Sequence, residues 1–580
     1  MMKKLITLVT LFALLACVAL PAIAETNTAE PIVVTMAMTG NRPLDCWTDC
    51  NDFVKLKEDH NITVDWQFYD DDKFALLLAG GNLPDVVLPR QVNLSSIIEN
   101  GLALNLDPLL EQYAPNLAGE TFSASLALSR KMLGGANGEL YFLPVGLGME
   151  SALPSETTSR GYRVRWDLYK QLGCPEINSD DDYIKIIKDM VALYPQTEDG
   201  RTVYGMGLYD RLNAWYTRAA WVKDVALCIW TFTGSQYMAT LEDTTLINGY
   251  MNTERSAFWT DMSFYNKLYS EGLLDPDSFI MTADENNSKL IAGQYVAAPF
   301  AGAGLYNERR KADPNTLVGL VSVPSANAIV PARKLQVSGG MPTDCIFVAR
   351  NTQNWEAALT MLNFFADPDV VRMTYNGIRG RDWDYDVNGV PYLTESALAD
   401  RATYTYGTEE YVKATGIYGQ IYSFTMFQGT AIAPDGYIYN IAQMPAERVR
   451  SLSPLYRDVA DTQGVSRPSE AFMNLVYDGT TIDNLNDYAQ LVAVGISDIP
   501  MDIQRIMNNL NDILYNAIPS LVMAESEEEF LSVREQVLAN LVAADEATAW
   551  AWCESAFNAS KEIMKPLFEE ARDLYLATAK

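Results

Sequence analysis

Histidine is almost absent from this chain, in which His60 is the one histidine among 580 residues. A Cys/His zinc site and a histidine-based catalytic triad therefore lack their usual side chain. The sequence also contains no G-x-S-x-G, H-E-x-x-H or P-loop motif, which mark esterases, zinc proteases and nucleotide-binding enzymes. We accordingly expect no catalytic residues, no metal ligands and no cofactor. A glycosidase stays open, because its paired carboxylates leave no spaced motif.

Basic residues are also few. The chain has 43 Lys and Arg against 74 Asp and Glu, for a formal net charge of -31. Such a chain would repel nucleic acid and anionic membrane surfaces, so we expect neither as its main partner. With 48% hydrophobic and 20% charged residues, the composition is that of a globular protein. A length of 580 residues predicts two domains or more.

Cysteine is scarce, with seven residues in the whole chain. Cys46 and Cys50 are close enough in sequence to form a disulfide across a small loop if the chain is exported. The other cysteines beyond the leader are scattered, and we expect them to behave as small buried hydrophobic residues. They are Cys174, Cys228, Cys345 and Cys553.

The apolar run at residues 5–20 is too short and too early for a membrane span. It follows a basic start and precedes small residues up to Ala24, which is the pattern of a secretory signal peptide. We therefore predict a signal peptide at residues 1–24 and a secreted protein. The alternative is a lipid anchor at the cell surface, because residues 14–17 resemble a bacterial lipobox ending in Cys17.

Strand and helix patterns alternate at the start of the mature chain. Three β-rich runs, at residues 31–38, 62–68 and 85–88, are separated by helical patterns at 51–57 and 73–79. This order predicts an open parallel sheet, and ligands of such sheets lie beyond the carboxyl ends of the strands. Four residues that follow the first and third strands are therefore candidate ligand contacts: Arg42, Trp47, Arg90 and Gln91.

A second set of elements follows an uncharged, glycine-punctuated segment near residue 146. Such segments join separate compact bodies, so we predict two lobes with a ligand between them. The second set comprises helices at 181–193 and 258–271 and strands at 202–208, 295–300 and 317–323. A strand at 345–349 and a helix at 355–366 return to the first lobe, and residues 525–580 form a helical tail.

The predicted fold class is α/β, with each lobe a mostly parallel sheet flanked by helices and with a helical C-terminal extension. Lobe 1 is predicted at residues 25–147 and 338–400, and lobe 2 at 152–325 and 401–580. The hinge crossings are predicted at residues 144–152 and 324–337.

Six segments resemble, in the family's order, motifs of extracellular solute-binding protein family 1, the carbohydrate-binding component of ABC importers. The similarity is greatest to its LplA-like branch. The segments are Ala79–Val87, Leu106–Asn116, Gly138–Pro144, Arg165–Gly173, Tyr265–Asp277 and Asn354–Phe365. Each is weak alone, and the specificity of the resemblance comes from their common order.

The resemblance implies a type II periplasmic-binding-protein fold that closes on a sugar or oligosaccharide and delivers it to a membrane permease. It also implies that Glu150, directly after the first crossing, faces the ligand. The 11 Trp and 31 Tyr residues agree with a sugar ligand, because aromatic rings stack on the CH faces of sugars. The stacking candidates are Trp47, Trp215, Trp221, Trp230 and Trp383. The alternative for each of them is a core aromatic.

Arg379 and Arg381 lie just before Trp383. Two arginines in a cleft would suit a carboxylate, and hence an acidic oligosaccharide. The alternative is a pair of surface salt bridges.

Residues 384–395 fit the spacing of a calcium loop, with Asp384, Asp386, Asn388 and Glu395 as ligands. However, Asn388 and the glycine after it are a strong hairpin signal, and a strand-like run follows. We prefer the hairpin, with calcium as the alternative.

Two other functions stay open. One is a secreted glycoside hydrolase that uses paired carboxylates. The other is a surface protein that senses sugar by presenting it to a receptor instead of a permease.

Overall fold

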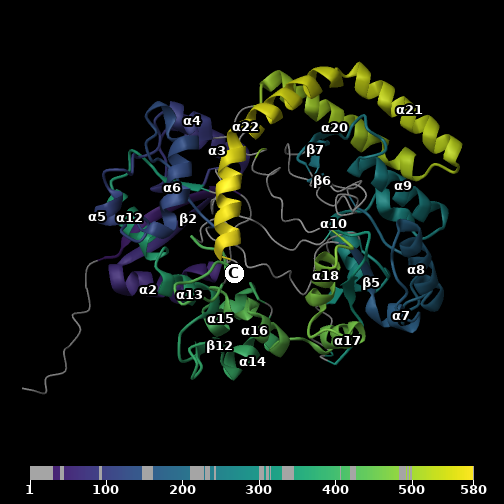
Figure 1. Cartoon of the computed structure of the whole chain (residues 1–580), viewed down its shortest axis with the longest axis horizontal. Coiled ribbons are helices and arrows are strands. Elements are labelled where there is room, and N and C mark those ends of the chain that lie inside the picture. Colours follow the sequence, from purple (N-terminus) through teal and green to yellow (C-terminus); the bar gives the residue numbers. More distant parts are fainter. Residues whose placement is uncertain are drawn as a thin grey trace, which may run out of the picture.

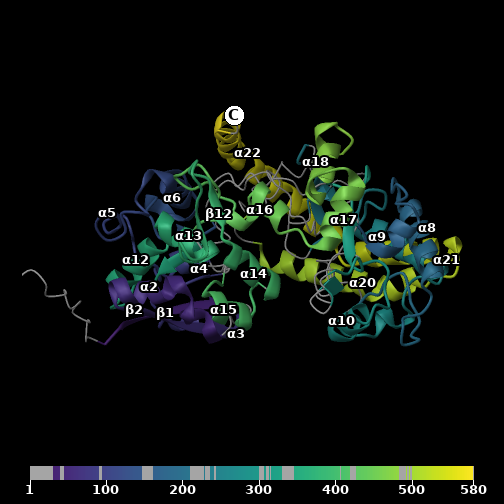
Figure 2. The same cartoon turned by 90° about the horizontal axis from the view of Figure 1, so that it is seen from below.

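The computed structural model of the chain describes residues 30–39, 45–89, 94–146, 161–209, 227–228, 235–240, 243–298, 306–307, 313, 315–329, 345–404, 406–418, 426–481, 492, 496 and 499–578. Figures 1 and 2 show two bodies side by side. The first body consists of the described residues of 30–146 and 345–450, and the second body of those of 161–329 and 454–578.

The first body is built on a sheet with helices on both faces. Its elements up to the first crossing are β1 (Ile32–Thr39), η1 (Asp45–Asp49), α2 (Asn51–His60), β2 (Ile62–Tyr69), α3 (Asp71–Gly80), β3 (Val86–Val87), α4 (Leu94–Glu99), α5 (Leu110–Tyr113), α6 (Glu120–Leu133), η3 (Gly135–Asn137) and β4 (Leu143–Pro144). The chain returns to it with β10 (Cys345–Val348), α12 (Trp355–Phe364), α13 (Pro368–Asn376), β11 (Trp383–Tyr385), β12 (Pro391–Leu393), α14 (Glu395–Thr403), α15 (Glu409–Thr415), η8 (Ile441–Gln443) and α16 (Pro445–Arg450).

The strand order of this sheet is β2-β1-β3-β10-β4. β1 pairs in parallel with β2 and β3, whereas β10 is antiparallel to β3 and β4. In β1, Val34, Met36 and Met38 pack into the core on one face, and Ala37 packs into the core on the other. This alternation explains why apolar residues occupy consecutive positions of β1, and it confirms the predicted strand at 31–38.

The second body contains fewer long strands. Its elements are β5 (Tyr162–Arg165), α7 (Trp166–Gln171), α8 (Asp180–Leu193), β6 (Leu227–Cys228), β7 (Tyr237–Thr240), β8 (Leu246–Asn248), α9 (Ala257–Ser270), η6 (Pro276–Phe279), α10 (Ala283–Ile291), β9 (Leu320–Val323), α17 (Pro454–Gln463), α18 (Pro468–Tyr477), α20 (Met501–Val522), α21 (Glu527–Ala543) and α22 (Glu546–Thr578). β5 pairs antiparallel with β9, and β6, β7 and β8 form an antiparallel sheet.

The predicted mostly parallel sheet therefore differs from the described strands of the second body. Parallel pairing occurs there as isolated bridges, between Tyr204 and Tyr295 and between Met206 and Leu274. The predicted strand at 202–208 is reduced to these bridges. Gly205 lies between them, and a Cβ on it would be 2.5 Å from Ile187 Cγ2 and 2.8 Å from the Leu273 carbonyl oxygen. The backbone approaches its neighbours closely at this position, which requires glycine.

The C-terminal tail packs on the second body. α20 lies against α9, α21 and α22, and the Asn266 amide of α9 donates to the carbonyl groups of Leu521, Val522 and Ala524 at the end of α20. α22 begins at Glu546, whose carboxylate accepts from the Tyr237 hydroxyl at 2.9 Å. The tail predicted at 525–580 is thus two helices. Figure 2 shows the C-terminal end of α22 projecting from one face of the molecule.

The predicted lobe boundary at residue 400 differs from the packing. Val412, Met426, Phe427 and Tyr439 belong to the core cluster of the first sheet, whereas Leu455, Tyr456 and Val459 belong to the core of the second body. Strand and helix patterns do not locate this boundary, because burial is set by tertiary contacts that such patterns do not reveal. None of the described helices combines the length and apolarity that a membrane crossing requires.

Candidate functional site

Two parallel strands of the first body's sheet end side by side. β1 ends at Thr39 and β3 at Val87, and these carboxyl ends are neighbours because the two strands run in parallel. Ligands of open sheets lie at this edge. Seven of the predicted ligand residues lie outside the part of the chain that the structure describes. They are Arg42, Arg90, Gln91, Glu150, Trp215, Trp221 and Trp230.

Trp47 is the predicted contact at this edge that the structure describes, and it is a core residue. It lies on η1 and is 3% exposed. Its ring stacks on Trp66 of β2, with centroids 4.8 Å apart and planes 12° apart. The Tyr418 ring packs against it at 5.1 Å. Trp47 is therefore a buried core aromatic residue in this structure, which is the alternative to a sugar-stacking role.

Trp383 is buried as well, at 6% exposed. Its indole N–H donates to the Gly377 carbonyl oxygen at 3.1 Å, and its ring packs in a small cluster that includes Leu393 and Ile441. This contact explains the position of the ring at the start of β11, but it leaves little surface for a sugar.

Arg379 and Arg381 are both paired with carboxylates. Arg379 Nε lies 3.1 Å from Asp384 Oδ1, and its guanidinium lies 4.8 Å above the centre of the Tyr385 ring. Arg381 Nη2 lies 2.7 Å from Asp382 Oδ2. The Tyr385 backbone N–H, and then the Arg379 guanidinium, hold the pKa of Asp384 below its usual value. Both arginines therefore form salt bridges, which is the alternative to binding a carboxylate of the ligand.

The segment with calcium-loop spacing is a hairpin, as preferred from the sequence. β11 and β12 are antiparallel, and Asp386 accepts the backbone N–H groups of Asn388 and Val390 at 2.8 and 2.9 Å. Glu395 pairs with Arg450 instead of facing the hairpin. Within the part of the chain that the structure describes, no group of three or more His, Cys, Asp or Glu side chains is placed to hold a metal ion.

The cysteines near η1 are not bonded to each other. Cys46 and Cys50 are buried free thiols, so the disulfide considered from the sequence is not formed in this structure. Desolvation by burial raises the pKa of both thiols, most strongly that of Cys50. Cys345 and Cys553 are buried, as expected, and Cys174 is half-buried. The side chain of Cys228 is not among those that the structure describes.

The family-like motifs supply structural contacts. In Leu106–Asn116, the Asp107 carboxylate accepts from Arg130 at 2.7 Å and from the Leu140 backbone N–H at 2.9 Å. Asp85 of Ala79–Val87 accepts from the backbone N–H of Thr35 at 2.8 Å, which ties β3 to β1. These two motif residues thus hold elements of the first body together.

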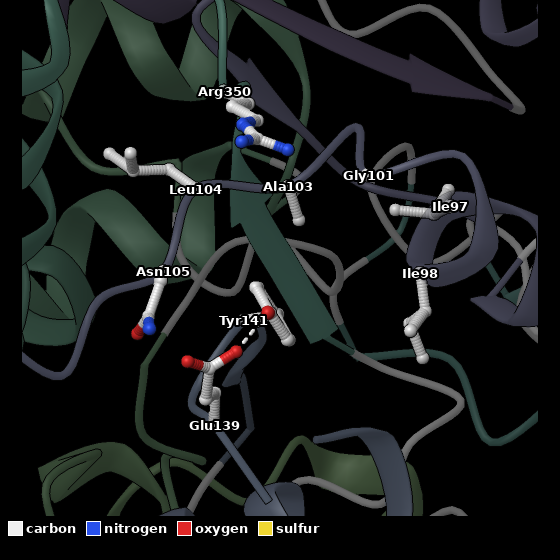
Figure 3. Close-up of a pocket in the computed structure, with 9 residues that line it drawn as sticks. All are labelled: Ile97, Ile98, Gly101, Ala103, Leu104, Asn105, Glu139, Tyr141 and Arg350. Carbon is white, nitrogen blue, oxygen red and sulfur yellow. Dashed lines mark hydrogen bonds between the residues drawn. The ribbon is translucent and has the colours of Figure 1, made fainter. Parts of the chain in front are cut away.

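A pocket that the sequence did not predict lies at the other edge of the first sheet (Figure 3). It has a volume of about 380 Å³ and combines apolar side chains with Glu139, Tyr141 and Arg350. These residues come from segments far apart in the sequence, and no motif spacing links them.

Comparisons with known proteins identify the fold. No model of a known protein family matches the chain. Lipoprotein LipO of Bacillus subtilis (strain 168) is 22% identical over 325 residues, which are 54% of this chain and 59% of that protein. The chain thus spans less than two thirds of the length of this curated relative.

Solved structures align along nearly their whole length. An HMO binding ABC-transporter associated solute binding protein from Bifidobacterium longum infantis is 14% identical, with 91% of this chain and 99% of that chain covered and a TM-score of 0.58. Alginate-binding protein AlgQ2 is 15% identical, with 92% and 99% covered and a TM-score of 0.55. FusA of S. pneumoniae in complex with kestose is 12% identical, with 92% and 100% covered and a TM-score of 0.53. The chain therefore has the two-lobe α/β fold of the solute-binding proteins of ABC transporters, as predicted.

Proposed function

We propose that this chain is an extracellular solute-binding protein that captures a sugar or oligosaccharide between its two bodies and delivers it to the permease of an ABC importer. The observation that supports this most is the fold, which aligns over 91% of the chain with an HMO-binding protein and over 92% with FusA bound to kestose. The mechanism would be closure of the two bodies, because a ligand that contacts both favours the closed state.

The proposed ligand site lies at the carboxyl ends of β1 and β3 and on the facing surface of the second body. Arg42, Arg90 and Gln91 would donate hydrogen bonds to sugar hydroxyls, with Glu150 as an acceptor. Trp215, Trp221 and Trp230 would stack on sugar rings. Trp47 and Trp383 are left out of this site, because their rings are buried in the structure.

A neutral glycan suits the chain better than an acidic one. The formal net charge of -31 repels polyanions, and Arg379 and Arg381 already have carboxylate partners. An acidic glycan is the second candidate, favoured by the positive charges of the predicted contacts Arg42 and Arg90 and by the likeness to alginate-binding protein AlgQ2.

We also propose that the chain binds its sugar without cleaving it. The structures it resembles are named as binding proteins. The protein would act outside the cell, either released after residue 24 or anchored through Cys17, and the likeness to a lipoprotein supports the anchor.

The test is calorimetric titration of the mature protein with neutral oligosaccharides and with uronate oligosaccharides of equal length. Trp215→Ala, Trp221→Ala and Trp230→Ala are compared with Trp355→Ala, which lies at the opposite edge of the first sheet. At least one of the three should weaken binding about tenfold or more, since burying an aromatic ring against a sugar face contributes about 1.5–3 kcal/mol, while the control should not. Release of shorter glycans during a long incubation would contradict the proposal, and so would an absence of binding across both series.

A further inference from the structure

The pocket of Figure 3 lies at the sheet edge opposite to the proposed sugar site. β10 runs antiparallel to β3, with Val348 opposite Val86, so Arg350 leaves β10 beside the start of β3. The backbone N–H of Arg350 donates to the Leu102 carbonyl oxygen at 2.8 Å, which places the pocket between β10, the end of α4 and the segment before β4. Its lining comprises Ile97, Ile98, Gly101, Ala103, Leu104, Asn105, Glu139, Tyr141 and Arg350.

Arg350 brings to this pocket a positive charge that forms no ion pair with a described residue. Among the described residues its guanidinium has neither a carboxylate nor a hydrogen-bond partner, although acidic residues outnumber basic ones in the chain by 74 to 43. A Cβ at position 101 would lie 3.0 Å from Arg350 Nη1. Gly101, with a φ of 60°, therefore leaves the room that the guanidinium occupies.

The other polar groups of the pocket have defined orientations. The Tyr141 hydroxyl donates to Glu139 Oε2, and this bond raises the pKa of Tyr141. Asn105 Oδ1 accepts the backbone N–H of Asp107 at 3.0 Å, so its amide NH₂ group remains a donor. Arg350 and Asn105 are thus the donors available to a ligand.

Apolar surface completes the pocket. Figure 3 shows Ile97 and Ile98 along one side, with Arg350 at one end and Glu139 and Tyr141 toward the other. A volume of about 380 Å³ is in the range of small-molecule sites. A planar carboxylate matches the fork of donors on a guanidinium, and an apolar group would cover the isoleucines.

We propose that this pocket is a second binding site, separate from the proposed sugar site, for a small carboxylate that carries an apolar body. The Arg350 guanidinium binds the carboxylate, and Ile97 and Ile98 contact the apolar part. The Glu139 carboxylate repels the ligand, and the hydrogen bond from Tyr141 weakens that repulsion.

The test uses benzoate and hexanoate as probes, with benzamide and hexanamide as their uncharged counterparts, titrated into the full mature protein without sugar. Both carboxylates should bind, and both amides should bind at least about tenfold more weakly, because an amide lacks the negative charge that pairs with the guanidinium. Equal affinity for acid and amide, or no binding of either acid, overturns the proposal.

Two variants with opposite expected effects locate the site. Arg350→Gln should weaken carboxylate binding about tenfold or more, and Glu139→Gln should strengthen it several-fold. Arg201→Gln, an exposed arginine of the second body that is paired with Asp199, is the control and should leave the affinity unchanged. Circular dichroism and the melting temperature confirm folding of each variant. A folded Arg350→Gln protein with wild-type affinity, or a loss of affinity in Glu139→Gln, overturns the assignment.

Discussion

The two bodies each bury an aspartate from a family-like motif, and they satisfy its carboxylate by different means. In the first body, Asp85 is 7% exposed and accepts hydrogen bonds from uncharged donors on Thr35, Thr352 and Asn354. In the second body, Asp275 is 1% exposed and lies 2.9 Å from Lys289 Nζ and 2.8 Å from the Tyr295 hydroxyl. Burying a charge is costly unless it is compensated, and hydrogen bonds and an opposite charge are two ways to do so.

The surroundings explain the difference. Asp85 lies where β1, β3 and the start of α12 meet, and the backbone and side-chain donors of these elements are already close to it. Asp275 begins η6, beside the isolated bridges of the second body, and Lys289 reaches it from α10. The first body is therefore held by its sheet, and the second body depends more on contacts between helices and loops.

The largest effect is expected from Trp47→Ala in the first body. Removing a buried tryptophan costs about 3–5 kcal/mol, and Trp66 and Tyr418 would lose their ring contact. Hydrogen–deuterium exchange should rise in β1 and β2 and change little in α9 and α20, because the two cores form separate clusters. Sugar affinity of the folded variant should be unchanged. Equal increases in hydrogen exchange in both bodies would show that their two cores do not unfold independently.

Asp275→Ala should lower the free energy of unfolding by about 2–3 kcal/mol. The variant removes one partner of a buried ion pair and also leaves the Tyr295 hydroxyl without its acceptor. Asp277→Ala is the matched control, because Asp277 contacts the same lysine at 2.7 Å but is 53% exposed, and exposed pairs contribute less than about 1 kcal/mol. Urea titration measures both. Similar losses in the two variants would show that burial is not what makes Asp275 important.

Asp85→Asn should cost less, about 1–2 kcal/mol, because its partners are uncharged and the amide keeps one acceptor oxygen. The amide NH₂ group would meet donors on Thr35 or Asn354. The change should raise hydrogen exchange in β3 before any other strand. A loss as large as that of Asp275→Ala would mean that the two bodies stabilise their aspartates equally well.

Much of the first body could be predicted from its sequence. The runs at 31–38 and 345–349 became β1 and β10, because they are rich in apolar residues that the sheet buries. The run at 62–68 became β2, because its apolar and polar residues alternate. The end of α21 could not be predicted. The chain turns at Asp545, with a φ of 66°, in a conformation that sequence signals usually assign to glycine. Pro566 lies inside α22, where a proline normally predicts an end.

The candidate site was less predictable, because ring exposure is a tertiary property. Trp47 follows β1 as a ligand residue would, yet Trp66 and Tyr418, far away in sequence, cover it. Arg379 and Arg381 pair with carboxylates within their own segment, which is the salt-bridge alternative that their exposed, polar segment allows. The pocket beside Arg350 had no signal, since three separate segments form it.

The smallest predicted effect concerns Asp52 of α2, a third buried aspartate. It is 4% exposed and accepts from the Thr374 hydroxyl at 2.8 Å and from the Phe53 backbone N–H at 2.9 Å. These donors lower its pKa less than burial raises it, so the net pKa is raised. Asp52 therefore resembles Asp85 in having uncharged hydrogen-bond partners. The pH dependence of stability at Asp52 measures how far such partners offset the cost of burying a carboxylate.

With a raised pKa, the folded chain takes up a proton on Asp52 at a higher pH than the unfolded chain does. Stability relative to Asp52→Asn should thus increase as the pH falls from 7 through the folded pKa toward the unfolded value of about 3.9. Urea unfolding of both proteins at several pH values measures this difference. Asp59→Asn, an exposed residue paired with Lys55, should show no such rise. Parallel curves for wild type and Asp52→Asn would mean that hydrogen bonds alone offset the burial of this carboxylate.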